Sequence, residues 1–579
     1  MAQELDREEL MKGVLGFSVF VGAIACAPVA GYWLYRWKSS VRPKFTKNEI
    51  IVCIAALLFL FLFWILFLDP TPFFKPDALY PHLLKHQKNI PLVSTKIIWL
   101  WCAGLSVSHL IAPVVLRLKK EEKGVRTQYF IRSFLSKKTN WKLMRIAFQI
   151  SNEFPIGIDV KTLELISVSD KTRTHHMLVI GAPGSGKTTL MANAILYAVK
   201  HNQPCVVIDP KGDDSTLGEI INYGRMLTPD FDERFQLFTI SKPGKSFKYN
   251  PLKHGSASEL KDRIMEALTW SEQYYQNIAG DFLTQFTAAT EYLGQTLTLD
   301  RISKVLSFKE DQASILNELK NRFQSGSGNE RALKLMDALS QFFSKNYEGA
   351  LSGLSAQISI LNNPTFGSLL SFDTTKNEID FRESRKKGKI VYFQLNTLGN
   401  GDSARRLGRM VIEDLKALSG EVYSTEPIES LRPFFPIFID EFGSFATREF
   451  IEFLKQSRGA NFGVHLFCQG LEDLDVVSPE FRRQVITCTK TKIGMRMDDH
   501  ETVNEICATA GTFDAIEQSY QVEGDLMVKK TGMGNMRLTK QMQIEHDVFK
   551  QLRTGEAVVI QKSPIQVNGI LICQASELV

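Results

Sequence analysis

Three long apolar runs dominate the first 118 residues of the chain. They cover about 14–35, 50–68 and 97–116, and the second is uncharged throughout. Runs of this length can cross the hydrocarbon core of a bilayer as helices. Basic residues crowd the connection after the first run and the segment after the third, and the positive-inside rule places both segments in the cytoplasm. We therefore predict a multi-pass membrane anchor over residues 1–118, with three spans, or two if the first run lies in the interface or forms a hairpin.

After the third run the pattern changes to short apolar strands that alternate with helical periods. Buried strands separated by helices are typical of a parallel sheet with helices on both faces. We expect an α/β domain in two parts, 119–252 and 386–579, with a hairpin turn around Gly532 to Asn535. The strand-like segments are 154–169, the run that begins at 177, 204–209, 235–240, 389–396, 436–441, 463–469, 492–495, 557–561 and 565–572.

The region between the two parts has a different pattern. From Lys253 to about Asn363, apolar residues recur at helical spacing and no strand-like alternation appears. We predict an all-α inserted domain over residues 253–385. The stretch 253–363 holds 11 Lys and Arg against 13 Asp and Glu, a net charge of −2. Its bulk composition therefore shows no basic face for gripping DNA.

Composition adds modest limits to this picture. A chain of 579 residues is too long for one ordinary core, and its formal charge of +6 argues only weakly for nucleic acid. The eight cysteines include no C-x-x-C pair, so we interpret them as reduced, buried thiols in a cytosolic environment. His465 and Cys468 lie among apolar strand residues without a partner at metal-ligand spacing, and we assign both to the core.

The sequence MLVIGAPGSGKTT, at 177–189, matches the phosphate-binding loop G-x-x-x-x-G-K-[ST] between a strand and a helix. Glycines let backbone N–H groups turn inward around a polyphosphate, and the helix that follows presents its positive end. Lys187 reaches the outer phosphates and the Thr188 hydroxyl suits Mg²⁺. The residues expected to hold the nucleotide are Gly181, Pro183, Gly184, Ser185, Gly186, Lys187, Thr188 and Thr189.

A pair of acids ends the strand-like segment 436–441. Open α/β sheets bind their ligands at the carboxyl edge, where this pair falls. Asp440 suits the Mg²⁺ shell, and Glu441 can polarise the water that attacks the terminal phosphate. An acidic helix cap is the structural alternative, and the phosphate loop argues against it.

Three further side chains are candidates for the same chemistry. Gln469 ends the strand 463–469 with an amide that can contact a terminal phosphate, although a turn glutamine explains it equally well. Arg458 can reach a neighbouring subunit's nucleotide as an arginine finger, and Arg496 is a second candidate for that role.

The motifs together resemble the type IV secretion coupling proteins, the membrane-bound ATPases of conjugation and effector export. The resemblance runs from about Arg117 to the C-terminus and is specific in combination, because any one motif alone indicates only a P-loop ATPase. It rests on the N-terminal anchor, an all-helical insertion, and GAPGSGKTT, VVIDPKGD at 206–213, YNPL at 249–252, IFIDE at 437–441 and SRGANFGVHLFCQG at 457–470.

This family resemblance implies a RecA-like ATPase that uses ATP and Mg²⁺ as a homo-hexameric ring. It implies a place in the bacterial inner membrane, with the ATPase domain in the cytoplasm. The implied partners are the type IV secretion channel proteins, and the implied cargo is single-stranded DNA with its relaxase, protein effectors, or both.

The family motifs also imply roles for individual residues. Gln469 matches the sensor glutamine, and Arg458 matches the arginine of a G-R-K-A-G-like segment. Ser457 and Gly459 depart from that segment here. The remaining matches are Lys187 and Thr188 in the phosphate loop and Asp440 and Glu441 in the acidic pair.

We therefore expect a membrane-anchored ATP-hydrolysing receptor and motor for conjugative transfer. A translocase of the FtsK/HerA kind is disfavoured because the helical insertion follows YNPL and no C-terminal DNA-reading domain is visible. A nucleotide-switched scaffold without motor activity is disfavoured because Lys187, Asp440 and Glu441 are all intact. The sequence leaves open whether DNA or protein is the cargo.

Overall fold

The computed structural model describes residues 137–579, except 161, 325–329, 371–376, 429–431, 524–528 and 563–565. The predicted membrane spans at 14–35, 50–68 and 97–116 lie outside the described residues. Among the residues that are described, no helix is both long and apolar enough to cross a membrane. The chain divides into two compact units, and the larger one holds Trp141–Ile158, Leu165–Gly511 and Met542–Val579.

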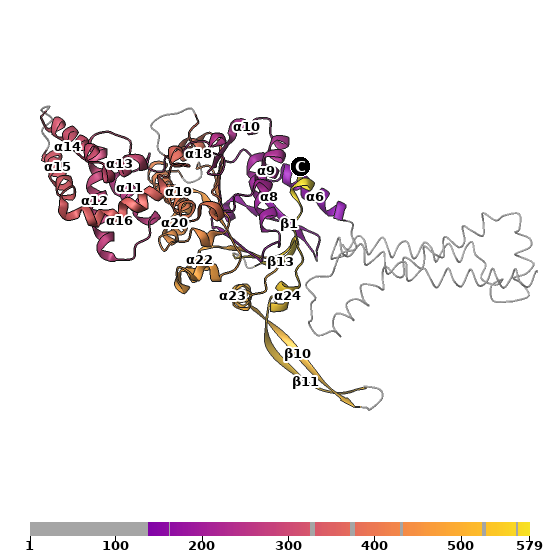
Figure 1. Cartoon of the computed structure of the whole chain (residues 1–579). Coiled ribbons are helices and arrows are strands. Elements are labelled where there is room, and N and C mark those ends of the chain that lie inside the picture. Colours follow the sequence, from indigo (N-terminus) through magenta and orange to yellow (C-terminus); the bar gives the residue numbers. More distant parts are fainter. Residues whose placement is uncertain are drawn as a thin grey trace, which may run out of the picture. The chain divides into compact units, whose positions relative to one another are not determined.

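An eleven-stranded sheet forms the centre of the larger unit (Figure 1), in the order β2-β1-β13-β12-β9-β3-β8-β7-β4-β6-β5. Seven neighbouring strands, from β9 to β5, run parallel. Their bounds are β9 Thr491–Gly494, β3 Met177–Ile180, β8 Phe462–Cys468, β7 Phe435–Ile439, β4 Cys205–Asp209, β6 Ile390–Gln394 and β5 Phe235–Thr239.

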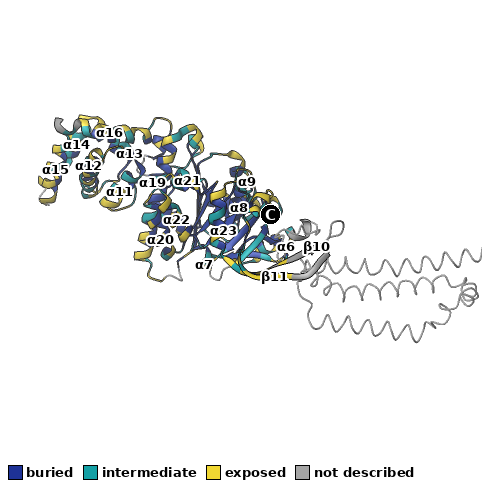
Figure 2. Cartoon of the chain, turned by 90° about the horizontal axis from the view of Figure 1, so that it is seen from below, coloured by how far each residue is buried: buried dark blue, intermediate teal, exposed yellow. Residues whose placement is uncertain are grey.

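The parallel strands are apolar on both faces because helices cover both sides of the sheet. Every residue of β3, β4, β6, β7 and β8 is buried. Figure 2 shows this centre in dark blue, within more exposed helices. Continuous apolar runs such as MLVI and FPIFI are what a doubly covered parallel strand requires.

The direction of each crossover decides which face a helix covers. Right-handed connections place α8 (Lys187–Lys200) and α9 (Asp214–Leu227) on one face, and these two helices pack together. The later crossovers, which lead from β6 back to β9, place three helices on the other face, and each of these packs against the next. These are α19 Thr397–Thr425, α20 Phe450–Ser457 and α22 Pro479–Cys488.

The prediction of a parallel sheet needs one correction, because the β9 edge of the sheet is extended by antiparallel pairs. β12 (Glu556–Gln561) runs antiparallel to both β9 and β13 (Gln566–Leu571). The predicted strand region 154–169 forms two antiparallel strands, β1 (Glu153–Asp159) and β2 (Leu165–Ser169). The sheet is therefore mixed, with a parallel centre.

Helices fill the region between β5 and β6, where the sequence predicted them. Their bounds are α11 Ala257–Ala267, α12 Gln273–Tyr292, α13 Leu299–Ser307, α14 Lys309–Gln324, α15 Glu330–Phe342, α16 Lys345–Leu361, α17 Gly367–Leu370 and α18 Phe381–Lys386.

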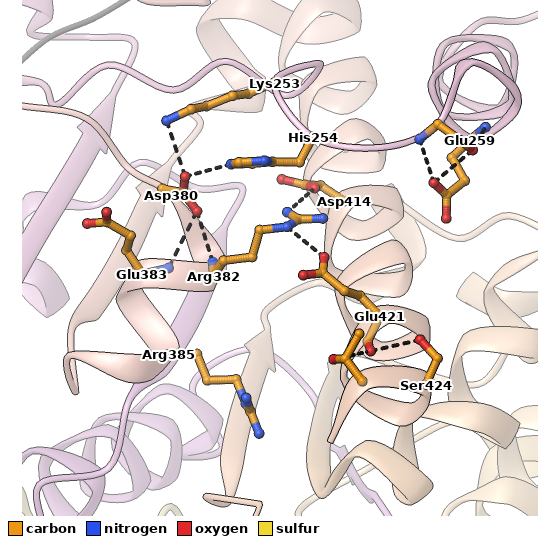
Figure 3. A network of polar contacts seen from close by, with 12 residues as sticks. Lys253, His254, Glu259, Asp380, Arg382, Glu383, Arg385, Asp414, Glu421 and Ser424 are labelled. Atoms are coloured by element: carbon orange, nitrogen blue, oxygen red, sulfur yellow. Dashed lines mark hydrogen bonds and ion pairs between the residues drawn. The ribbon is translucent and has the colours of Figure 1, made fainter. Parts of the chain in front are cut away.

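A polar network joins these helices to the core (Figure 3). Asp414 on α19 pairs with Arg263 of α11 at 3.2 Å and with Arg382 of α18 at 3.3 Å. Asp380, at the start of α18, accepts hydrogen bonds from the backbone N–H groups of Arg382 and Glu383 and pairs with Lys253 at 3.2 Å.

The predicted hairpin exists, but its turn was predicted in the wrong place. β10 (Thr512–Glu523) and β11 (Lys529–Met542) form a separate two-stranded sheet. Gly532 to Asn535 lie within β11, and the strands are joined between Glu523 and Lys529. Glycines inside a strand gave a local turn signal, which the cross-strand pairing overrides. Small remaining helices include α6 Lys137–Ile150, α23 His500–Ala510 and α24 His546–Gln551.

Candidate nucleotide site

The phosphate loop connects β3 to α8 at the carboxyl edge of the parallel strands. Gly184 and Gly186 have φ of +71° and +111°, which glycine adopts without the steric cost that other residues meet. The Lys187 ammonium donates to the carbonyl oxygens of Gly181 and, at 3.3 Å, Ala182. The Lys187 side chain therefore lies along the inside of its own loop.

Distant segments also hold this loop. Ala182 N donates to the Arg496 carbonyl oxygen at 2.8 Å, just after β9. Thr554 Oγ1 donates to the Gly184 carbonyl at 3.1 Å, and Gly555 N donates to the Ser185 carbonyl at 3.0 Å. Sequence reasoning missed Thr554 and Gly555, because only their place just before β12 brings them here.

The acidic pair follows β7, between β4 and β8. Asp440 is only 2% exposed, and the Glu441 N–H donates to its Oδ1 at 3.0 Å. Glu441 has a φ of +42°, a left-handed conformation that is uncommon for a residue with a side chain. It precedes the short helix η3 (Phe442–Ser444), but its side chain makes no capping hydrogen bond there. The Glu441 carboxylate instead contacts side chains from neighbouring strand ends.

One of these side chains is the predicted sensor. Gln469 follows β8 and donates from Nε2 to Glu441 Oε1 at 3.1 Å. Its backbone N–H donates to Asp473 Oδ2 at 3.3 Å. Glu441 and Gln469 are thus brought together at the ends of two adjacent parallel strands.

The other side chain was given no role from the sequence. Lys211, after β4, lies 3.0 Å from Asp440 Oδ2 and 3.3 Å from Glu441 Oε1. Its backbone N–H donates to Asp209 Oδ1 at 2.8 Å. Asp209 Oδ2 accepts from the Tyr392 hydroxyl, also at 2.8 Å. The only sequence signal for Lys211 was the motif VVIDPKGD.

The charges of this cluster act on one another. Burial, together with the positive charge of Lys211, lowers the pKa of Lys187, while Asp440 and Glu441 oppose that change. Burial acts to lower the pKa of Lys211 as well, but the two carboxylates outweigh it and raise that pKa. Burial raises the pKa of Asp209 to about 6, even though Tyr392 and the Lys211 N–H stabilise its ionised form. The side chains of Lys187, Lys211, Asp440 and Glu441 therefore lie close together beside the phosphate loop.

The oxygen donors at this edge fit a nucleotide-bound Mg²⁺. Thr188 is the second residue of α8, next to Lys187, and Asp440 supplies a buried carboxylate. Within the described part of the chain, no group of three His, Cys, Asp or Glu side chains could bind a metal alone. Mg²⁺ commonly takes one or two protein oxygens together with waters and substrate phosphates. A hydroxyl and one carboxylate are adequate for an ion that arrives with its nucleotide.

Arg458 lies at the other edge of the sheet. It begins η4 (Arg458–Ala460), just before β8, and is exposed. Gln469 follows the same strand, whose seven residues span about 23 Å. The structure therefore does not bring Arg458 to the phosphate loop of its own chain. Arg496 lies beside that loop, with Nη2 3.5 Å from the Pro183 carbonyl oxygen.

His465 and Cys468 lie in the core, within β8. The His465 ring stacks on Phe438 with ring centroids 4.7 Å apart, and Arg173 Nε donates to its Nε2 at 3.3 Å. Burial lowers the pKa of His465 and raises that of Cys468, so both are neutral.

Comparison with protein families gives two matches. Residues 435–552 match the model described as the TraM recognition site of TraD and TraG. Residues 161–396 match the model of the central domain of the helicase HerA. No curated protein matches the chain.

Comparison with solved structures finds the same fold in plasmid coupling proteins. An unbound, N-terminally truncated form of the bacterial conjugative coupling protein TrwB is 13% identical with a TM-score of 0.52, over 76% of this chain and 92% of that one. A TrwB complex with ADP and Mg²⁺ is 13% identical with a TM-score of 0.50, over the same shares. These findings confirm the predicted P-loop ATPase class and the resemblance to type IV coupling proteins.

Proposed function

We propose that this chain, which resembles the type IV coupling proteins in sequence motifs and fold, is a membrane-anchored ATPase that drives substrate into a type IV secretion channel. Its anchor is residues 1–118, its nucleotide domain is 119–252 with 386–579, and its all-α insertion is 253–385. It works as a homo-hexamer on the cytoplasmic side of the bacterial inner membrane.

The observation that carries this proposal is the contact between Gln469 and Glu441 beside the phosphate loop. In-line attack on a terminal phosphate needs a group that orients the attacking water. Coupling of hydrolysis to movement also needs a group that detects the phosphate. Glu441 has the carboxylate for the first role, and Gln469 has an uncharged amide for the second. Lys187 binds the outer phosphates, and Thr188 and Asp440 hold the Mg²⁺ that neutralises them.

The TraD and TraG match supports the assignment to secretion, because it covers β7 and β8 together with Asp440, Glu441 and Gln469. The TrwB fold match, to a conjugative coupling protein, is consistent with a role in conjugation. The family resemblance adds single-stranded DNA with its relaxase, protein effectors, or both as the proposed cargo. Residues 253–363 have a net charge of −2, so their composition gives no excess of basic residues for DNA binding. We place the DNA contacts in the pore of the assembled ring, where basic loops of several subunits would meet.

The test is the ATPase rate of the full-length protein in detergent, with and without single-stranded DNA. Lys187→Ala and Glu441→Gln are the inactive controls. Stimulation by DNA that both variants abolish is the expected result. Hydrolysis that ignores DNA at concentrations where hexamers form would move the proposal to protein cargo, and no hydrolysis at all would favour the scaffold.

The HerA match over 161–396 favours one second candidate, a DNA translocase of the FtsK/HerA type. The same assay separates the two functions. Stronger stimulation by duplex DNA than by single strands would favour the HerA-type translocase, and the reverse order would favour the conjugative coupling protein.

A further inference from the structure

The turn that carries Lys211 is built rigidly. Asp209 Oδ1 accepts the Lys211 N–H at 2.8 Å. Gly212 has a φ of +69°, and a Cβ on it would lie 2.7 Å from Asn396 Cβ, so no larger residue fits. Lys211 is thus presented from β4 toward the end of β7, where Asp440 and Glu441 lie.

The two carboxylate oxygens of Asp440 have different partners, and Lys211 is one of them. The Glu441 N–H uses Oδ1 of this buried carboxylate, and the Lys211 ammonium uses Oδ2. A Mg²⁺ bound through Asp440 would lie within a few ångströms of that ammonium. Two cations at this distance repel each other strongly in a partly buried site. Binding of the metal at Asp440 and the ion pair with Lys211 are therefore mutually unfavourable.

The contact with Glu441 is different in kind. Lys211 and Gln469 both approach Oε1, at 3.3 Å and 3.1 Å. The carboxylate is therefore held through one oxygen by two groups from different strands. If the Lys211 ammonium leaves Asp440, it can keep its contact with Glu441, because the two acids are adjacent residues.

We propose that Lys211 is a positioning residue that holds the acidic pair in place before nucleotide binds, yields Asp440 to the incoming Mg²⁺, and continues to orient Glu441. This inference rests on the proposed ATPase function. It adds a residue to which no role was assigned, and it predicts that Mg²⁺ competes with a side chain of the protein itself.

Removal of the Lys211 charge should change two properties in opposite directions. In Lys211→Met and Lys211→Gln, Mg²⁺ meets no competing ammonium, so the Mg²⁺ concentration for half-maximal nucleotide binding should fall several-fold. Glu441 loses one of its two contacts, so kcat should fall. Lys211→Arg keeps the charge and should restore both properties toward those of the unsubstituted protein.

The matched control is Lys242→Met. Lys242 also forms an ion pair, with Asp214 at 2.6 Å, but both side chains are at least half exposed and neither contacts Asp440 or Glu441. Its removal tests for the general effect of losing one positive charge near the carboxyl edge of the sheet.

The experiment titrates a fluorescent ADP analogue into the detergent-solubilised full-length protein over a series of Mg²⁺ concentrations, with ATPase rates measured in parallel. A several-fold leftward shift of the Mg²⁺ dependence in both neutral variants, absent in Lys211→Arg and Lys242→Met, supports the proposal. An unchanged Mg²⁺ dependence, or an equal shift in Lys242→Met, overturns it. Because binding is read without hydrolysis, a protein that binds nucleotide but hydrolyses nothing refutes the ATPase function and still decides the role of Lys211.

Discussion

Gln469 Nε2 donates a hydrogen bond to Glu441 Oε1 at 3.1 Å, across the carboxyl ends of the adjacent parallel strands β8 and β7. An amide that contacted both the terminal phosphate and the Glu441 carboxylate would couple the presence of the phosphate to the position of that carboxylate. Loss of the phosphate on hydrolysis would then change the position of Glu441. With Gln469 in its proposed sensor role, this contact would link the nucleotide to β7, the strand that precedes η3.

Glu441→Gln should abolish hydrolysis while preserving nucleotide binding. General acid–base groups contribute about 10²–10⁴-fold to rates, so kcat should fall by that factor. Gln469→Ala removes one hydrogen bond to a charged group, worth about 1.5–3 kcal/mol, and should lower kcat by roughly ten- to a hundredfold. Steady-state ATPase assays and binding of a fluorescent nucleotide measure both effects. The exposed Gln456→Ala on α20 is the control, and an equal loss of rate in that variant would contradict the role of Gln469.

Local sequence patterns predicted those parts of the fold that depend on residues near one another in the chain. The parallel strands were visible because burial on both faces demands continuous apolar runs, as in FPIFI of β7. The antiparallel edge was not visible, because β12 pairs with β9 from more than sixty residues away. The hairpin turn was misplaced because glycines at 532 and 534 carry the same signal inside a strand as in a turn.

The residues of the site fall into the same two groups, those that local motifs identify and those that only the fold brings together. Motifs identified Lys187, Asp440 and Glu441, since each follows a strand that the pattern also marked. Thr554 reaches the phosphate loop only through the pairing of β12 in the sheet, and Lys211 meets the acidic pair only because β4 neighbours β7. Arg458 matched a family motif, but the strand that it precedes carries it to the opposite edge of the sheet.

Arg458 should act on the nucleotide of a neighbouring subunit or not at all. An arginine finger contributes about 10³–10⁵ in rate, so Arg458→Ala should lower kcat strongly. Subunits with Lys187→Ala keep the finger and lose their own site, whereas Arg458→Ala subunits keep the site and lose the finger. Mixing the two inactive proteins should therefore restore part of the ATPase activity.

Arg496→Ala is the control for this mixing experiment, because Arg496 contacts the phosphate loop of its own chain. The ATPase activity of a mixture of Arg496→Ala and Lys187→Ala subunits should equal the average of the two proteins measured separately. If the Arg458→Ala mixture is equally inactive, Arg458 does not act between subunits.

Asp414 should be the most costly residue to remove from the junction between the helical insertion and the core. It accepts a hydrogen bond from the buried Tyr249 hydroxyl at 2.9 Å and pairs with Arg263, whose side chain is 1% exposed. Asp414→Ala leaves that guanidinium buried without a charge partner, which costs about 3–5 kcal/mol. Tyr249→Phe should cost about 1 kcal/mol.

Thermal unfolding of the full-length protein, followed by intrinsic fluorescence, measures these changes as shifts of Tm. Glu421→Ala is the matched control, because Glu421 pairs with Arg382 from a half-exposed position and exposed pairs contribute less than about 1 kcal/mol. Equal Tm shifts for Asp414→Ala and Glu421→Ala would show that burial of Arg263 does not set the cost.

Asp209 should make the protein less stable as the pH rises from about 4 to 6. Burial raises the pKa of this carboxyl from an ordinary value of 3.8 to about 6 in the folded protein. The folded state then binds more protons than the unfolded state in this interval, so stability falls with increasing pH and levels off above it. A shift of this size corresponds to roughly 2–3 kcal/mol.

Asp209→Asn removes this penalty, because the amide stays neutral and its oxygen can still accept the Lys211 N–H. Its Tm relative to the unsubstituted protein should therefore increase between pH 4 and pH 6.5. Tyr392→Phe should act in the opposite direction, since the Tyr392 hydroxyl stabilises the ionised carboxylate through its 2.8 Å hydrogen bond. A Tm difference between Asp209→Asn and the unsubstituted protein that does not change with pH would show that Asp209 is already ionised at pH 4. The raised pKa would then have to be abandoned along with burial as its cause.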